Sequence, residues 1–217
     1  MQHIKIEGKS YSWTDLTPFL IASGTERFCF VNPENPDQLL KLSRKTRCKQ
    51  TKRELRYFQF LQKKKVPFLY LPTFYKAVNT ADFCGFVQQT VRNKNGDLAP
   101  SLHQYLSTGE KINKQQLSDL FCYLYHYNIL PCDLNQHNIL VQTKETQKLI
   151  LIDGLGCTDF MPLAQFWPWW GRRKIVRKFI RFIQENESLR AVFSNNQEIK
   201  KEVLSWAKNL PQAKVGD

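Results

Sequence analysis

Two polar residues with complementary chemistry lie five positions apart in the segment 133–141, DLNQHNILV. Asp133 begins this segment, and Asn138 precedes an apolar run that is expected to form a strand. A carboxylate in the first position can accept or orient the proton of an attacking hydroxyl. An amide oxygen in the second position can bind Mg²⁺ without adding another negative charge beside that base. The spacing therefore predicts Asp133 as a catalytic base and Asn138 as a metal ligand.

A second carboxylate, Asp153, ends the apolar run Leu149–Ile152 and is followed by Gly154. Glycine allows the chain to turn sharply after a strand. Asp153 is predicted as the main Mg²⁺ ligand, holding the metal that bridges the β- and γ-phosphates of ATP. An exposed loop followed by an aspartate at the end of a strand would give the same letters without any chemistry. Because the two motifs flank one predicted hairpin, phosphoryl transfer is favoured.

A lysine and a glutamate in the first half of the chain could complete such a site. Lys41 lies within an apolar strand, Leu39–Leu42, where a buried ammonium needs an anionic partner. Glu54 is the only acid in the basic helix predicted over 49–64. We expect an ion pair between Lys41 and Glu54 that directs the lysine toward the α- and β-phosphates. The alternative is that Glu54 only relieves repulsion among its basic neighbours.

Further nucleotide contacts are predicted at two places. The turn Ser23-Gly24-Thr25 lies between two expected strands, where a phosphate-covering loop belongs, although an ordinary hairpin turn would look the same. Gln89 and Val91 stand beside the linker expected near residue 90 and are also predicted to bind the nucleotide.

The elements that must position these residues change in type along the chain. Strands are predicted over 17–22, 27–31, 38–42 and 83–91, with the single helix over 49–64. Helices are predicted over 101–107 and 114–130, then a hairpin from 138–142 and 149–153, then mainly helix. The prediction is an α+β fold with a small β-rich lobe at 1–91 and a mainly helical lobe at 92–217.

Composition excludes several classes of protein. A hydrophobic fraction of 42% indicates a packed chain, and no stretch approaches the roughly 18 apolar residues of a membrane span. The N-terminus has no apolar signal region, which predicts a cytoplasmic protein. The six cysteines form no CxxC pair, so free thiols are expected rather than a zinc site or a disulfide framework.

The net charge of +13 is concentrated in two segments. Lys41–Lys65 carries eleven basic residues, and nucleic-acid binding there would use the interleaved aromatic residues Tyr57, Phe58 and Phe60. These aromatics stand at helical core spacing and no nucleic-acid motif accompanies them, which disfavours that alternative.

The second basic segment, 172–181, follows the tryptophans Trp167, Trp169 and Trp170. One hypothesis is an interfacial helix on an anionic membrane, peripheral on the cytoplasmic face of the inner membrane. The alternative, which base rates favour, is a helix packed on the core with its tryptophans inside. In both, Ile175 and Phe179 belong to the apolar side.

Over most of its length the chain resembles the YrbL family (PhoP regulatory network protein YrbL), a bacterial group within the protein-kinase-like superfamily. The resemblance rests on the stretches SGTERFCFVNPENPDQLLKLSR, RELRYFQFL and DLNQHNILV, and on the more specific tract MPLAQFWPWWGRRKIVRKFIRF. It implies an ATP-binding bilobal fold in a compact form, and a link to envelope or PhoP-type stress regulation.

Several positions depart from the protein-kinase pattern. Pro131-Cys132 replace the His-Arg that precedes the catalytic aspartate, and Asn135 replaces the lysine that meets the γ-phosphate. Gly154 replaces the phenylalanine of Asp-Phe-Gly. These departures favour transfer from ATP to the hydroxyl of a small molecule, a sugar or an envelope lipid over transfer to a protein. The alternative is a pseudokinase-type module that binds nucleotide, or a partner, with little or no catalysis.

Overall fold

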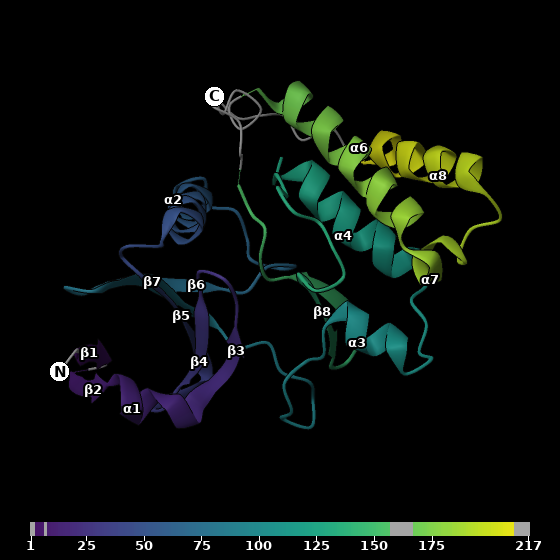
Figure 1. The fold of residues 1–217 in the computed structure, drawn as a ribbon. Helices are drawn as coiled ribbons and strands as arrows, with labels where there is room; N and C mark the ends of the chain where they lie inside the picture. The colour runs from purple at the N-terminus through teal and green to yellow at the C-terminus, as the bar shows by residue number, and fades with distance from the viewer. Residues whose placement is uncertain (1–2, 7, 157–166, 211–217) are drawn as a thin grey trace. The chain divides into compact units, whose positions relative to one another are not determined.

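A computed structural model describes residues 3–6, 8–156 and 167–210 of the chain. The chain divides into two compact units, Met1–Leu98 and Ala99–Asp217, of which the first is mainly β and the second mainly α (Figure 1). The sequence analysis places this division after residue 91. The segment 92–98 folds back onto the first unit, because Arg92 forms a bridge with Leu98 and its Nη2 donates to the Pro36 carbonyl at 3.0 Å.

The first unit consists of a small hairpin, two short helical turns, a five-stranded sheet and one longer helix (Figure 1). Its elements are β1 (His3–Ile6), β2 (Lys9–Ser12), α1 (Trp13–Leu16), η1 (Thr17–Phe19), β3 (Leu20–Ser23), β4 (Phe28–Asn32), β5 (Asn35–Arg44), α2 (Lys49–Lys63), β6 (Phe74–Asn79) and β7 (Phe83–Gln89). The strand order in the sheet is β3-β4-β5-β7-β6, with antiparallel neighbours throughout. The strand predicted from residue 17 begins at Leu20, because Pro18 lies in the 3₁₀ turn η1.

Alternation along β5 sends its side chains to two different environments. Leu40 and Leu42 are fully buried in a core that includes Phe30 and contacts Trp13. Lys41 and Ser43 face the opposite side, where Ser43 Oγ lies 2.6 Å from Thr51 Oγ1 of α2. The strand thus places Lys41 on the face of the sheet that α2 covers.

Helix α2 confirms the prediction for 49–64 and packs on β5 and β7. Its Phe58 is fully buried, with ring centroids 5.6 Å from Phe74 and 5.4 Å from Phe86. Tyr57 is also buried, at 3% exposure, so two of the aromatic residues in the basic segment are used by the core. Stacking of nucleobases on those two rings is therefore not supported.

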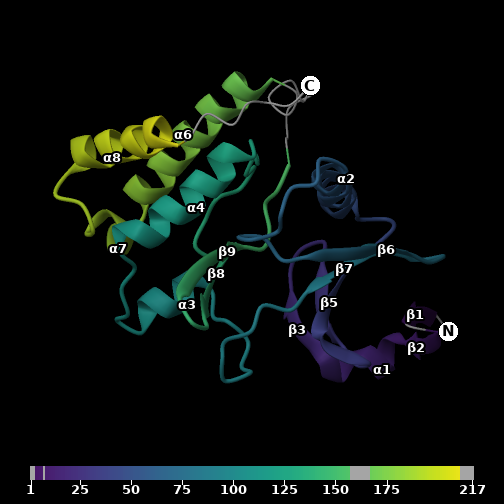
Figure 2. The same cartoon turned by 180° about the vertical axis from the view of Figure 1, so that it is seen from behind.

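The second unit combines helices with one hairpin. Its elements are α3 (Leu102–Ser107), α4 (Lys114–His126), β8 (Ile139–Thr143), β9 (Gln147–Leu151), α6 (Pro168–Glu185), α7 (Glu187–Arg190) and α8 (Asn196–Asn209). Helices α4, α6 and α8 pack against one another, and the hairpin lies beside α3 and α4 (Figures 1 and 2). None of the described helices combines the length and apolarity needed to cross a membrane.

Helix α4 ends earlier than the predicted residue 130. Asn128 adopts a left-handed backbone with φ of 52°, and Ile129 N donates to the Leu124 carbonyl at 2.8 Å. Asparagine tolerates this conformation, which closes the helix and redirects the chain toward the loop that contains Asp133.

The described cysteines are free thiols, and Cys157 lies outside the described residues. Burial raises the pKa of the Cys84 thiol to about 11, with a further contribution from its hydrogen bond with Cys48. A thiol with so high a pKa stays protonated at neutral pH and has little nucleophilic character.

An ion pair between α4 and α8 makes the stability of the second unit sensitive to acid. Lys114 Nζ lies 2.5 Å from Glu198 Oε1, and this bond, with a further one from Ser194 N, lowers the pKa of Glu198 from 4.5 to about 2. A depressed folded-state pKa adds stability above the unfolded-state value, and that stability is lost as the pH falls from about 4.5 to about 2.

We therefore expect the free energy of unfolding of Glu198→Gln to fall less steeply than that of the wild type as the pH is lowered through this range. The two proteins should reach similar stability near pH 2. Chemical unfolding followed by circular dichroism at several pH values measures the difference. Glu187→Gln, at an exposed glutamate of α7, is the matched control and should follow the wild type. Parallel pH profiles for the wild type and Glu198→Gln would contradict the assignment.

Candidate active site

The loop that carries Asp133 is fixed to the chain after β9 by backbone hydrogen bonds. Cys132 N and Asp133 N both donate to the Gly154 carbonyl, at 2.6 and 3.2 Å. Pro131 forms an isolated bridge with Leu155, and Gly156 N donates to the Leu130 carbonyl at 3.0 Å. The loop that carries Asp133 and the segment that carries Asp153 therefore form one connected structure in the second unit.

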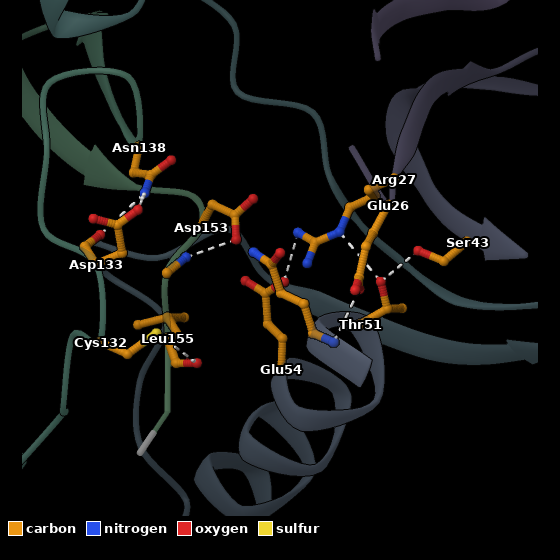
Figure 3. Close-up of polar contacts among 12 residues, drawn as sticks. Glu26, Arg27, Ser43, Thr51, Glu54, Cys132, Asp133, Asn138, Asp153 and Leu155 are labelled. Atoms are coloured by element: carbon orange, nitrogen blue, oxygen red, sulfur yellow. Dashed lines mark hydrogen bonds and ion pairs between the residues drawn. The ribbon is translucent and has the colours of Figure 1, made fainter. Parts of the chain in front are cut away.

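Asn138 is oriented by Asp133. Its Nδ2 donates to the Asp133 carbonyl at 3.0 Å and to Asp133 Oδ2 at 3.1 Å (Figure 3). Because the nitrogen is used in both bonds, the Asn138 side chain has its oxygen, Oδ1, to offer a cation. This is the atom that a magnesium ligand requires.

A backbone hydrogen bond next to Asp153 holds it near Asp133 and Asn138. Ile152 N, one residue before it, donates to the Asn138 carbonyl at 2.8 Å. The Asp153 carboxylate accepts from Gly154 N at 2.6 Å, as Figure 3 shows. Asp133 is exposed and Asp153 is half-buried. The structure thus brings the three predicted residues of this unit together at the open end of the β8–β9 hairpin, before β8 and after β9.

Gly154 makes the close approach of the two segments possible. Its φ is +71°, and a Cβ at this position would lie 2.3 Å from the Asp133 carbonyl oxygen. The departure from the Asp-Phe-Gly pattern therefore has a local cause, since no residue with a side chain fits between Asp153 and the loop.

Asn135 has a positioning role that the sequence analysis did not predict. Its Oδ1 accepts from His137 N at 2.9 Å and from Asn138 N at 3.1 Å. Short polar side chains commonly close turns in this way. The residue in the place of the γ-phosphate lysine thus holds the backbone that presents Asn138.

Lys178 of α6 also reaches this loop, which the sequence could not reveal. Its Nζ donates to the Cys132 carbonyl at 2.8 Å, directly before Asp133. The sequence shows only that Lys178 belongs to the basic side of an amphipathic helix. Its partner is set by the packing of α6 against α4.

The donor set fits magnesium held jointly with a nucleotide. No group of three or more His, Cys, Asp or Glu side chains among the described residues could hold a metal ion alone. Asp153 and Asn138 supply hard oxygen atoms, and Mg²⁺ is commonly bound by one or two such groups together with substrate phosphates. The residues present match that pattern.

In the first unit, Lys41 is 2% exposed and its Nζ lies 5.7 Å from the centroid of the Phe86 ring. Gly85, beside it on β7, cannot carry a side chain, because a Cβ would lie 2.0 Å from the Lys41 carbonyl oxygen. The Lys41 side chain is therefore buried on the face of the sheet that α2 covers. Glu54 is one of the buried residues of α2. The predicted Lys41–Glu54 pair stays a prediction.

Glu54 forms an ion pair that the sequence analysis did not foresee. Arg27 Nη1 lies 2.7 Å from Glu54 Oε2, and both side chains are almost completely buried (Figure 3). Arg27 Nε also donates to Thr51 Oγ1 at 3.3 Å. The alternation of β4 could have placed Arg27 on the face of Lys41, because Cys29, two residues further, pairs with Lys41.

The turn predicted to cover phosphates lies directly before this ion pair. Ser23 ends β3, Thr25 is exposed, and Gly24 N donates to the Arg27 carbonyl at 2.8 Å. Glu26 accepts from Gln50 N at 3.1 Å, near the start of α2, which has no side-chain cap of its own. The turn is therefore anchored to α2 at one end and exposed at the other.

The two predicted residues at the end of β7 are placed differently from each other. Gln89 Oε1 accepts from Thr73 Oγ1 at 3.2 Å, and Val91 is buried at 6% exposure. Gln88, which was not predicted, is 1% exposed, and its Oε1 has no hydrogen-bond partner in the described structure. By alternation it shares the face of Phe86 and Lys41. A buried acceptor without a donor is uncommon in folded proteins and calls for an explanation.

Comparison with known proteins identifies one matching family and two sequence relatives at 25% identity. A family model described as PhoP regulatory network protein YrbL matches residues 17–187. The uncharacterized protein YrbL of Escherichia coli (strain K12) is 25% identical over 175 residues, which cover 76% of this chain and 83% of that protein. The protein of the same name from Shigella flexneri matches equally well. Residues 161–166, which begin the tract MPLAQFWPWWGRRKIVRKFIRF, lie outside the described residues.

Solved structures with the same fold are kinases or kinase-like proteins. The complex of Rad53 (residues 1–466) with AMP-PNP has a TM-score of 0.56 at 12% identity, covering 91% of this chain and 53% of that chain. WbdD with the kinase inhibitor LY294002 has a TM-score of 0.56 at 15% identity, covering 97% and 48%. The chain thus spans about half the length of these structures. The similarity confirms the predicted protein-kinase-like fold.

Proposed function

Because this chain belongs to the YrbL family of PhoP regulatory network proteins and has a protein-kinase-like fold, we propose that it is an ATP- and Mg²⁺-dependent phosphotransferase. The proposed reaction moves the γ-phosphoryl group of ATP to a hydroxyl of a small molecule, a sugar or an envelope lipid. The observation that carries the proposal is the joined arrangement of Asp133, Asn138 and Asp153 in the second unit.

Each residue has a distinct part in the proposed reaction. The exposed Asp133 carboxylate accepts or orients the proton of the acceptor hydroxyl. Asn138 Oδ1 and the Asp153 carboxylate hold the metal, which neutralises charge on the phosphates when it is bound. Lys41 supplies a buried positive charge toward the α- and β-phosphates, and the Gln88 acceptor suits the amino group of an adenine.

A small acceptor is favoured over a protein acceptor by the loop itself. Asn135 is a neutral amide whose oxygen closes the turn, and this position therefore lacks the cation that the lysine of a protein kinase supplies to the transferring phosphate. The same observation supports the second candidate, a nucleotide-binding regulatory module with little turnover. Both candidates require a metal–nucleotide site, and only the first requires Asp133 to act on a hydroxyl.

The metal–nucleotide site is tested by thermal unfolding of the purified protein with ATP, with and without Mg²⁺. At a nucleotide concentration about 100 times Kd, binding adds about 2.7 kcal/mol of stability, or a rise in Tm of about 5 °C or more. Asp153→Asn should abolish the Mg²⁺-dependent part of this rise. Asp82→Asn, at an exposed aspartate, is the matched control and should keep it. An absent Tm shift at millimolar ATP would overturn the proposal.

A further inference from the structure

We propose that the N-terminal end of α6 and the tryptophans beside it form a docking surface for an anionic lipid bilayer. This surface, the tryptophan–arginine face, comprises Trp167, Trp169, Trp170, Arg173 and Arg177. The proposal concerns a partner of the second unit and does not depend on phosphoryl transfer.

The first observation is the exposure of three neighbouring indoles. Trp167, Trp169 and Trp170 are 54%, 58% and 44% exposed. The other two tryptophans of the chain are half-buried among aromatic side chains. Trp13 packs against Phe28, Phe30 and Phe83, and Trp206 packs against Phe121 and Phe193. Clustered exposed rings of this size mark a contact surface rather than ordinary surface composition.

The second observation is that α6 already has a full set of core residues without the tryptophans. Gly171, Ile175, Phe179, Phe182 and Ile183 are its buried residues. The packed-helix alternative is therefore correct for the body of α6, but it is wrong in placing these tryptophans in the core. Their side chains project from the end of a helix whose orientation is fixed by other residues.

The third observation is the distribution of charge. Residues 167–184 contain six basic residues and no acid. Two of these point toward the protein, since Arg172 Nε donates to the Tyr125 carbonyl and Lys178 Nζ to the Cys132 carbonyl. Arg173 and Arg177 are exposed and one helical turn apart, and the Arg173 guanidinium carbon lies 6.0 Å from the Trp169 ring centroid. Arg173 thus lies beside an exposed indole, and Arg177 follows one turn further along the same helix.

A bilayer with anionic headgroups matches both parts of this surface. Indole rings combine an apolar body with one N–H donor and accumulate at the headgroup level of membranes. Basic residues near an anionic leaflet each add roughly fivefold to binding at physiological salt. A nucleic acid would use the arginines but would not require three indoles at a helix end, so dependence on both groups distinguishes the bilayer.

The test is flotation of the full chain with vesicles of phosphatidylcholine alone and of phosphatidylcholine mixed with phosphatidylglycerol. We expect binding to the mixed vesicles to be at least about tenfold tighter. The double variant Arg173→Glu, Arg177→Glu should lose about tenfold or more of that binding. The matched control, Lys200→Glu with Lys201→Glu, makes the same charge change at exposed positions of α8 and should bind within about twofold of the wild type.

The indoles are tested separately by Trp167→Ala, Trp169→Ala and Trp170→Ala combined, and by quenching of tryptophan fluorescence with brominated lipids in the mixed vesicles. Loss of binding and strong quenching support the proposal. The proposal is overturned if the two double charge variants bind equally, if neutral and mixed vesicles are bound equally, or if the fluorescence is not quenched. It is also overturned if duplex DNA competes with the vesicles and the tryptophan substitutions leave the binding of DNA unchanged. If the triple variant fails to fold, the charge variants and the quenching still decide the outcome, without any need for ATP.

Discussion

Replacing Asp133 with alanine is expected to lower Mg²⁺-dependent ATP turnover by about 10²- to 10⁴-fold, the usual contribution of a positioned general base. The physical reason is that the proposed base is the exposed carboxylate of Asp133, which also accepts a hydrogen bond from Asn138 Nδ2. Turnover is measured as phosphate release from ATP, first with water and then with candidate hydroxyl acceptors. The nucleotide-dependent rise in Tm should remain, because both proposed metal ligands are kept and Asn138 Nδ2 still donates to the backbone carbonyl of residue 133.

The asparagine variant separates two roles of Asp133. Asp133→Asn keeps an oxygen that can accept from Asn138 Nδ2, but its amide cannot accept a proton from the acceptor. We expect it to be nearly as inactive as the alanine variant. Activity retained in Asp133→Asn but lost in Asp133→Ala would show that Asp133 only positions Asn138. Equal turnover in the wild type and both variants would leave the regulatory-module alternative.

Replacing Gly154 with alanine is expected to destabilise the second unit by roughly 2–5 kcal/mol. Left-handed backbone costs an alanine roughly 1–2 kcal/mol, and forcing an atom into occupied space costs typically 1–3 kcal/mol more. The occupied space here is the Asp133 carbonyl, 2.3 Å from the new Cβ. Since that carbonyl also accepts from Asn138 Nδ2, its displacement should weaken Mg²⁺–ATP binding as well.

Gly109→Ala is the matched control for backbone strain without a clash. Gly109 has a φ of +85°, and a Cβ there would meet nothing within 4 Å. Denaturant unfolding should show a loss of only about 1–2 kcal/mol for Gly109→Ala, with nucleotide binding intact. Similar losses for the two variants would show that the contact between Gly154 and Asp133 contributes little.

The close placement of the three candidate residues in the second unit could be predicted because their geometry is local. Asp133, Asn138 and Asp153 flank a short hairpin, and strand pairing alone brings the two ends of a hairpin together. The contribution of Lys178 could not be predicted, since it depends on how α6 packs against α4. Nor could Asn135 be recognised as a turn-closing residue, because the same letter serves equally well in solvent.

The first unit shows a similar limit. The buried position of Lys41 follows from its apolar strand, but the partner of Glu54 depends on strand pairing between β4 and β5. Arg27 stands at the first position of a predicted strand, and only the pairing of β4 with β5 places it on the face of Lys41. The strand β6 was also missed, as its sequence FYKAVN is largely exposed and lacks a continuous apolar run.

The bond between Lys178 and the Cys132 carbonyl joins the loop that carries Asp133 to the helix that begins at the tryptophans. With a rise of 1.5 Å per residue, Lys178 lies about 12–17 Å along α6 from those rings. If the chain binds a membrane through that helix end, the proposed base Asp133 would lie at a constant distance from the lipid headgroups. The rate of the proposed transfer to a lipid acceptor would then depend on the mole fraction of that acceptor in the membrane surface. Adding inert lipid at a constant total amount of acceptor would therefore slow the reaction.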